Sequence, residues 1–203
     1  MDPYNPYSPP AVSVDTIGFE TMRLAYRPAQ GMGTKWMYLG VSLAQFVVSL
    51  GAGLTDDSKL KALFALVQLP LALTSLVLIG MWIYTAWSDI PADERGDITP
   101  GSAVGKLFIP FYNVYWIFAI STSLCDALNF KLVRIGSQPL APKGLAVLGC
   151  IFHLLTSTTN IPGLEAAGSF IAVISYGLWF AYMFECDKAR TILARNTYEE
   201  RND

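Results

Sequence analysis

The sequence predicts an all-α membrane protein, with four transmembrane helices and an interfacial or re-entrant helical element between the second and third spans. The prediction rests on four long apolar runs, a low content of charged residues and an uneven distribution of Lys and Arg. Only 15% of the 203 residues are charged and 53% are hydrophobic. A soluble domain averages about 25% charged residues, so this composition is typical of a chain folded largely in lipid.

The four apolar runs contain no Asp, Glu, Lys or Arg, and they cover residues 36–54, 62–87, 144–159 and 166–184. A helix needs about 20 apolar residues to cross the hydrocarbon core of a bilayer. We therefore predict four crossings in a membrane domain of residues 36–186. The flanking segments are predicted to be a Pro/Tyr-rich tail with an amphipathic lead-in (residues 1–35) and a polar tail (residues 187–203).

Positive charge sets the predicted orientation. Lys59 and Lys61 lie between the first two runs, and no basic residue lies between the last two. The other 12 of the 14 Lys and Arg residues precede the first run, follow the last run, or lie between the second and third. Because segments rich in Lys and Arg stay in the cytoplasm, we predict a multi-pass protein with both termini cytoplasmic.

The element between the second and third spans, residues 102–136, is the difficult part of this topology. Residues 107–124 are uncharged, and a fifth span there is the alternative. A fifth span would reverse the charge asymmetry, and Pro110 interrupts the segment, so we interpret it as broken, interfacial or re-entrant. We expect Asn113 to cap the following helix and the aromatic residues to anchor at the headgroups. The motif comprises Pro100, Gly101, Gly105, Pro110, Tyr112, Asn113, Tyr115 and Trp116.

Three stretches carry a family resemblance. Residues 82–87 read WIYTAW, residues 99–118 read TPGSAVGKLFIPFYNVYWIF, and residues 5–10 read NPYSPP. This pattern resembles a family of bacterial integral membrane proteins, a domain of unknown function that begins with an NPYxPP-like head. The chain departs from the pattern at residues 88–93, where more Arg and Asn would be expected. The resemblance implies a bacterial cytoplasmic membrane and supplies no activity.

Small residues recur at helical spacing on the third and fourth spans. In lipid, small residues let helix backbones approach closely, because packing replaces the hydrophobic effect there. We expect both stripes to face protein rather than acyl chains. They consist of Ala146, Gly149, Cys150 and Thr156 on the third span, and of Gly168, Ala172 and Ser175 on the fourth.

Three polar side chains fall inside the predicted spans: Gln45, Gln68 and His153. An ionisable residue within a membrane is by default a candidate functional residue. His153, the only histidine, can ligate a haem-type or chlorophyll-type cofactor or relay protons. The alternative is a neutral imidazole hydrogen-bonded to Thr156, Ser157 or another helix. The cofactor, if there is one, is not identified by the sequence.

The remaining polar residues indicate no catalytic or metal centre. Glu185, Asp187, Lys188 and Arg190 are expected to form a solvated, locally paired helix end. Trp82 and Trp87 are expected at a membrane interface. The three cysteines form no CxxC or His/Cys cluster, so we expect structural cysteines and no metal. A net charge of −2 gives no basic field for nucleic acid.

The sequence therefore favours a non-enzymatic protein, an accessory or scaffold subunit whose partners are the lipid bilayer and other membrane proteins or further copies of itself. Two alternatives stay open. One is a small oligomeric transporter or channel, with Gln45, Gln68 and His153 lining a polar path. The other is a membrane subunit that binds a cofactor through His153.

Overall fold

The computed structural model describes residues 33–92, 94–156 and 165–202, and this part of the chain is helical without strands. The helices are α2 (Thr34–Leu54), α3 (Ser58–Ser88), α4 (Pro100–Gly105), the 3₁₀ helix η1 (Lys106–Phe108), α5 (Tyr112–Arg134), α6 (Lys143–Thr156) and α7 (Glu165–Asn202). The predicted all-α fold is confirmed. The Pro/Tyr-rich head, Ser157 and the predicted turn between the last two spans lie outside the described residues.

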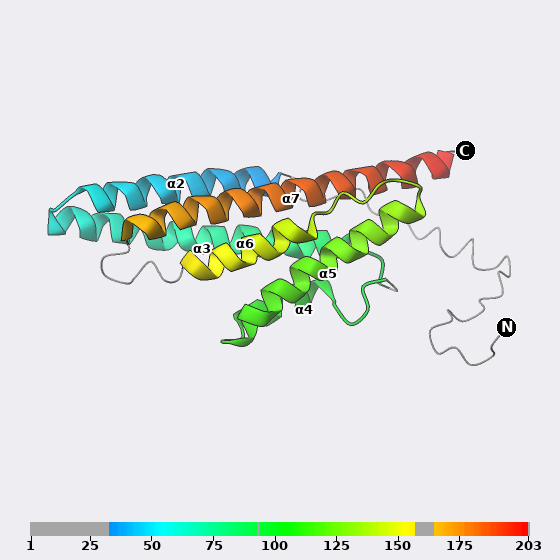
Figure 1. Ribbon diagram of the computed structural model, residues 1–203, viewed down its shortest axis with the longest axis horizontal. Helices are drawn as coiled ribbons and strands as arrows, with labels where there is room; N and C mark the ends of the chain where they lie inside the picture. Colours follow the sequence, from blue (N-terminus) through cyan, green and yellow to red (C-terminus); the bar gives the residue numbers. More distant parts are fainter. Residues whose placement is uncertain (1–32, 93, 157–164, 203) are drawn as a thin grey trace.

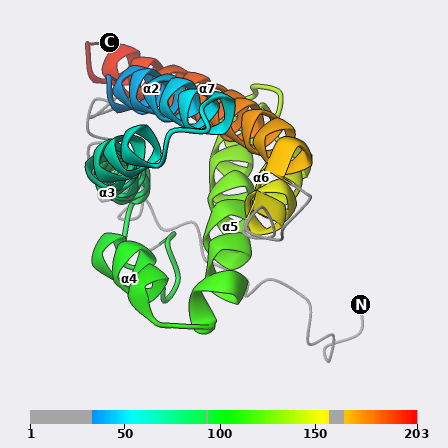
Figure 2. The same ribbon diagram turned by 90° about the vertical axis from the view of Figure 1, so that its left-hand side faces the viewer.

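Helices α2 and α3 form an antiparallel hairpin beside α7 (Figure 1). The side chain of Asp57 caps α3, because its Oδ1 accepts hydrogen bonds from the backbone N–H groups of Lys59 at 2.8 Å and Leu60 at 3.4 Å. Viewed end-on, α6 packs beside α7 and α5 beside α6, while α4 lies on the far side next to α3 (Figure 2).

Within the described residues, four helices are long and apolar enough to cross a membrane: α2, α3, α5 and residues Phe170–Asn196 of α7. α6 has 14 described residues and is a shorter apolar helix. α2 has 21 residues, which at 1.5 Å per residue is about 31 Å, close to the thickness of a hydrocarbon core of about 30 Å. The start of α5 falls in the element predicted to be interfacial or re-entrant, and the helix itself continues to Arg134.

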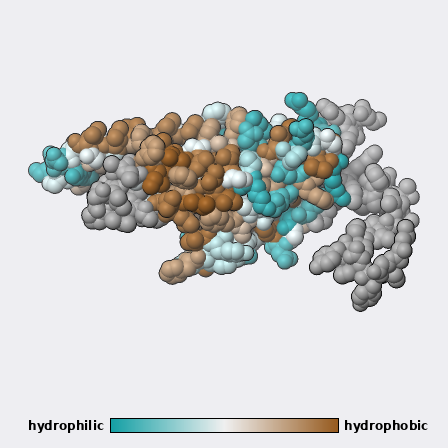
Figure 3. Space-filling model, in the orientation of Figure 1, coloured by the Kyte–Doolittle hydropathy of each residue, from teal (hydrophilic) through white to brown (hydrophobic). Residues whose placement is uncertain are grey.

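The surface divides along the long axis of the molecule (Figure 3). One region, here called the apolar section, exposes large apolar side chains of α2, α3, α6 and α7, including Leu43, Val47, Leu66, Leu148 and Phe170. It is followed by a hydrophilic region, here called the polar end, which holds the first turn of α2, the C-terminal end of α3 and residues 185–196 of α7. The apolar section has the character of a lipid-facing belt.

The predicted break at Pro110 is present. η1 ends at Phe108, Phe111 adopts φ 61°, and α5 begins at Tyr112. The expected cap by Asn113 is wrong, since Phe111 occupies the N-cap position and makes no side-chain cap bond. The backbone N–H of Asn113 instead donates to the carbonyl of Ile109 at 3.0 Å. The turn therefore satisfies this donor without a side chain.

Candidate functional site

Four charged side chains are buried together at the polar end. Lys35 comes from the first turn of α2, Asp89 directly follows α3, and Asp187 and Arg190 lie on α7. Asp187 and Arg190 are fully buried, while Asp89 and Lys35 are 4% and 6% exposed. We call this set the ionic cluster. Two carboxylates face two cations, so the cluster is formally neutral.

Arg190 links the two carboxylates. Its Nη1 lies 2.7 Å from Asp187 Oδ1, and its Nε donates to Asp89 Oδ2 at 2.7 Å. Asp187 and Arg190 are one helical turn apart on α7, the spacing at which side chains on one face meet. Bonds of this kind between charged partners are stronger than neutral hydrogen bonds. Arg190 therefore joins α7 to the end of α3.

Asp187 in turn joins α7 to α2 and α3. Lys35 Nζ lies 3.1 Å from its Oδ2, and Trp82 Nε1 donates to its Oδ1 at 3.1 Å. Trp82 is fully buried and stacks edge-on against Tyr182, with ring centroids 5.6 Å apart. The indole supplies a neutral donor to this buried carboxylate. Three helices thus meet at a single carboxylate.

These positions correct two predictions. Asp187 and Arg190 are not a solvated helix end, although their neighbours Glu185 and Lys188 do form an exposed pair at 2.8 Å. Trp82 and Trp87 are not interfacial anchors, because both are buried. The spacing of charges on α7 looks the same for a solvated and a buried pair. Only the partners on α2 and α3, more than 90 residues away in the sequence, distinguish the two.

A line of buried polar side chains leads from the ionic cluster into the apolar section. Lys35, Tyr38, Ser42 and Gln45 follow one another at intervals of three or four residues on α2, and all are buried. We call this line the α2 polar stripe. Ser75 of α3 donates its hydroxyl to Gln45 Oε1 at 2.8 Å. The stripe therefore faces the inside of the bundle, where α3 and α7 pack against α2.

The other intramembrane polar residues lie elsewhere. Gln68 is half-buried on α3, and its Oε1 has no hydrogen-bond partner among the described residues. His153 is exposed on α6. The hydroxyl of Thr156 donates to the backbone carbonyl of His153 at 2.6 Å, so it does not bind the imidazole. Gln45 and His153 consequently do not line one path.

The small-residue stripes are largely inside the bundle. Ala146, Gly149 and Cys150 are buried on α6, and Gly168 and Ser175 are buried on α7, while Ala172 and Thr156 are half-buried. A Cβ at Gly149 would lie 3.7 Å from the Trp179 ring. The buried Ser175 hydroxyl has no hydrogen-bond partner among the described residues. This contact surface is thus occupied by the chain's own helices.

The aromatic motif residues divide into two groups. Tyr112 and Tyr115 are 37% and 65% exposed. Trp116, expected at the headgroups, is instead buried and donates its Nε1–H to the carbonyl of Ala103 at 2.9 Å. Pro100 is the first residue of α4, Gly101 follows it, and Gly105 ends the helix. The motif therefore forms a turn that is held by one internal hydrogen bond, from Trp116 to Ala103, and not a set of aromatic residues that all lie at the headgroups.

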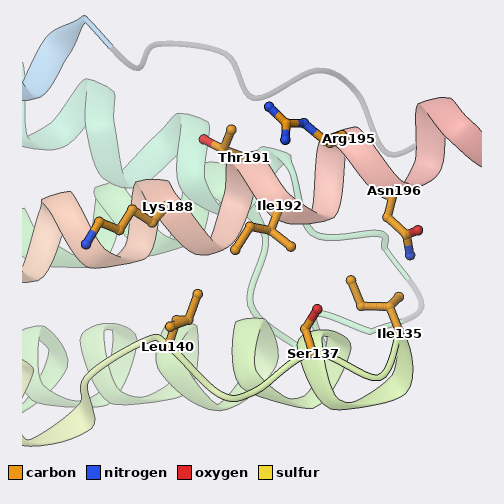
Figure 4. Close-up of a pocket in the computed structure, with 8 residues that line it drawn as sticks. All are labelled: Ile135, Ser137, Leu140, Lys188, Thr191, Ile192, Arg195 and Asn196. Atoms are coloured by element: carbon orange, nitrogen blue, oxygen red, sulfur yellow. The ribbon is translucent and has the colours of Figure 1, made fainter.

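A groove of about 460 Å³ lies at the polar end between α7 and the segment that follows α5. Its lining residues are Ile135, Ser137, Leu140, Lys188, Thr191, Ile192, Arg195 and Asn196. Figure 4 shows Ile192 and Asn196 projecting toward the segment that carries Ile135, Ser137 and Leu140, while Thr191 and Arg195 lie along the opposite edge of α7. The polar groups do not converge, so the groove has no arrangement suited to one charged ligand.

The arrangement defines a multi-pass, all-α membrane protein with a charged junction in its interior. Within the described residues, no group of three or more His, Cys, Asp and Glu side chains could hold a metal ion, and the three cysteines are free and buried. No family model, no curated protein and no solved structure matches the chain.

Proposed function

We propose that this membrane protein is an accessory or scaffold subunit that packs beside another membrane protein or a second copy of itself. The observation that carries the proposal is the position of His153. Its side chain is exposed on α6, one helical turn beyond the buried Gly149 and Cys150 and on the same face of the helix. A polar group on a lipid-facing surface is costly, and intramembrane polar groups are usually satisfied by other protein.

The small-residue stripes support the same proposal by elimination. They are engaged between α6 and α7, so a partner would meet the stripe of α6 where it becomes exposed, at His153. A hydrogen bond between helices in lipid contributes about 1–2 kcal/mol in model peptides. That amount is enough to orient a partner that already packs against the exposed apolar side chains of α6.

The proposed setting is the bacterial cytoplasmic membrane, with both termini in the cytoplasm. The asymmetry of Lys and Arg supports this orientation, and the polar end would then be cytoplasmic. The resemblance of residues 82–118 to a family of bacterial integral membrane proteins supports the bacterial source. Membership of that family is likewise part of the proposal.

The test is association of the full chain after extraction in mild detergent. Mass spectrometry identifies what co-purifies, and the mass of the purified particle gives its copy number. We expect a stoichiometric complex that His153→Leu weakens about tenfold, since 1.4 kcal/mol corresponds to a factor of ten in affinity. Leu148→Ala, exposed on the other face of α6, is the control. A monomer without a partner, or equal loss in both variants, would contradict the proposal.

A second candidate, a small transporter or channel, is favoured by the α2 polar stripe. Buried hydroxyl and amide groups in a membrane interior are typical of substrate and ion pathways. The structure changes which residues matter, because Gln45 lies inside the bundle and His153 outside. In liposomes carrying the full chain, proton or monovalent-cation flux should fall with Gln45→Leu and persist with His153→Ala. Absence of flux in the wild type would exclude these solutes.

The cofactor alternative rests on His153 alone. An axial ligand on an outer face would hold a cofactor between this chain and a partner rather than within the bundle. The absorption spectrum of the same preparation tests this possibility. A Soret or chlorin band that His153→Leu removes would support it, and a colourless complex would end it.

A further inference from the structure

The chain between α3 and α6 forms a hairpin whose arms are α4 with η1 and α5. The hairpin starts with a capping box, in which Thr99 Oγ1 accepts from the Ser102 backbone N–H at 3.0 Å and Ser102 Oγ accepts from the Thr99 N–H at 2.9 Å. The bond from Trp116 Nε1 to the carbonyl of Ala103 joins the two arms. Lys106 Nζ lies 4.2 Å above the Trp116 ring. The two arms are therefore fixed as one unit.

The tip of this hairpin exposes apolar and aromatic side chains. Phe111 is 92% exposed, Tyr115 65%, Phe108 64% and Ile109 49%. Phe111 also adopts a positive φ of 61°, which is uncommon for any residue but glycine and unfavourable for a bulky one. A tip of this composition in water would expose a large apolar surface at a cost of about 25 cal/mol per Å². The medium in contact with the tip must therefore be apolar.

The position of the tip indicates what this apolar medium is. In Figure 3 the tip lies level with the apolar section, while the hairpin's outer ends lie level with the polar end. Ion pairs mark those outer ends: Lys131 meets Glu94 at 3.1 Å, and Lys143 meets Asp126 at 2.7 Å, with both of the latter side chains more than half exposed. The apolar surface thus continues from the helices onto the tip, and the surrounding medium is lipid.

The lengths of the arms fit a hairpin that turns within the bilayer. Residues 100–108 comprise six α-helical and three 3₁₀ residues, about 15 Å in all at 1.5 and 2.0 Å per residue. That is half of a hydrocarbon core of about 30 Å. On the return, α5 has 14 residues from Tyr112 to Cys125 before Asp126, about 21 Å. α3 ends and α6 begins at the polar end (Figure 1).

We infer that residues 100–134 form a re-entrant hairpin that enters the bilayer from the polar end and returns to the same side, with Phe111 among the acyl chains near the bilayer centre. Its partner is the lipid of one leaflet. The turn pairs the backbone N–H groups of Ile109, Tyr112 and Asn113 with carbonyls of the hairpin itself at 2.7–3.3 Å, so few backbone donors are left unpaired in lipid. α5 is then the return arm of the hairpin rather than a fifth crossing.

Sidedness in liposomes tests the inference first. Single cysteines replace Ala92 and Gln138, two exposed residues that flank the hairpin, and a membrane-impermeant maleimide is added before and after the vesicles are opened. The native cysteines are buried, and the wild type measures their background. We expect Ala92→Cys and Gln138→Cys to be labelled from the same side. Labelling from opposite sides would make α5 a crossing helix and overturn the inference.

Depth is the second measurement. A fluorophore on Phe111→Cys is quenched by lipids brominated at different chain positions, with Val47→Cys, exposed in the apolar section, as the deep reference. We expect residue 111 to be quenched best by lipids brominated deep in the chain, and to resist the impermeant maleimide from both sides. Ready labelling of residue 111 by that reagent would show that the tip lies in water or at the headgroups, and would overturn the inference.

Discussion

The polar end and the apolar section both bury polar side chains, and they satisfy them with different chemistry. At the polar end, four charges are buried in the ionic cluster, with contacts of 2.7–3.1 Å around Asp187. In the apolar section, the interior bond is a neutral one, from Ser75 to Gln45 at 2.8 Å. A neutral group that loses its partner in lipid costs far less than an ion that does so. Charge is therefore concentrated where several partners are available.

The comparison implies that the two regions are held together by different forces. Removing one partner of a buried ion pair leaves an uncompensated charge, so the polar end should be sensitive to single charge deletions. The apolar section gains nothing from the hydrophobic effect between its helices in lipid, and depends on close packing. Substitutions in the two regions should differ in size and in the type of change that matters.

The largest effect is expected for Asp187→Ala. The change leaves Lys35 buried without its carboxylate and removes one of the two acids around Arg190, and losing a partner in such a pair costs about 3–5 kcal/mol. Unfolding of the purified protein in mixed micelles by increasing SDS measures the free energy. Glu185→Ala, two residues away in an exposed pair with Lys188, should change it by less than about 1 kcal/mol.

A rescue variant distinguishes charge from volume in the ionic cluster. Lys35→Met combined with Asp187→Leu removes both charges and keeps apolar volume, and such replacements are often near neutral. We expect the double variant to recover at least half of the loss caused by Asp187→Ala. If the double variant and Asp187→Ala lose the same free energy of unfolding, packing rather than charge stabilises the polar end, and the comparison fails.

An intermediate effect is expected for Gly51→Ala in the apolar section. A Cβ at this position would lie 2.8 Å from Phe64 Cζ, and overpacking typically costs about 1–3 kcal/mol. The higher helix propensity of Ala over Gly offsets about 1 kcal/mol of this loss in the free energy of unfolding. We expect a net loss of about 1 kcal/mol, measured by the same SDS titration.

Gly149→Ala is the matched control, because its Cβ would make ordinary contact with Trp179 at 3.7 Å. It should be neutral or stabilising. Phe64→Leu, which shortens the side chain that Gly51 accommodates, should reduce the cost of Gly51→Ala. A loss at Gly149 as large as that at Gly51 would mean that α6 and α7 approach more closely than the structure shows.

The smallest effect is expected for the Gln45–Ser75 hydrogen bond. Coupling energies between helices in a membrane average about 0.6 kcal/mol. A double-mutant cycle of Gln45→Leu and Ser75→Ala should return a coupling of about that size. Ser49→Ala, on an exposed position of α2, controls for loss of a hydroxyl. A coupling energy above about 2 kcal/mol would make this hydrogen bond as strong as an interaction in the ionic cluster, and would contradict the difference between the two regions.

The fold class could be predicted because it depends on features that are local in the sequence. Apolar runs predict α2, α3, α6 and α7, and the start of α4 follows from Thr99 and Pro100. The break before α5 follows from Pro110. Each of these features needs only neighbouring residues. The continuation of α7 as one helix from the fourth run through residues 185–195 is likewise local.

The ionic cluster could not be predicted, because its members are separated by as many as 155 positions, from Lys35 to Arg190. Asp187 and Arg190 at a spacing of three residues resemble many exposed pairs, and Lys35 resembles a basic residue that flanks a span. One weak signal was available. Lys35, Tyr38, Ser42 and Gln45 share a single face of α2, and a cation that is buried at the start of such a face needs an acid opposite it.

The length of α7 has a mechanical consequence. With 38 residues the helix is about 57 Å long, nearly twice the thickness of a hydrocarbon core. Because the helix is continuous, a tilt of about 10° would move its far end by roughly 10 Å relative to the other end. Asp187 and Arg190 fasten it to α2 and α3 partway along. A force applied to residues beyond 195 would therefore be transmitted along α7 to its membrane-embedded part. Asp187 and Arg190 would be the point about which the helix turns.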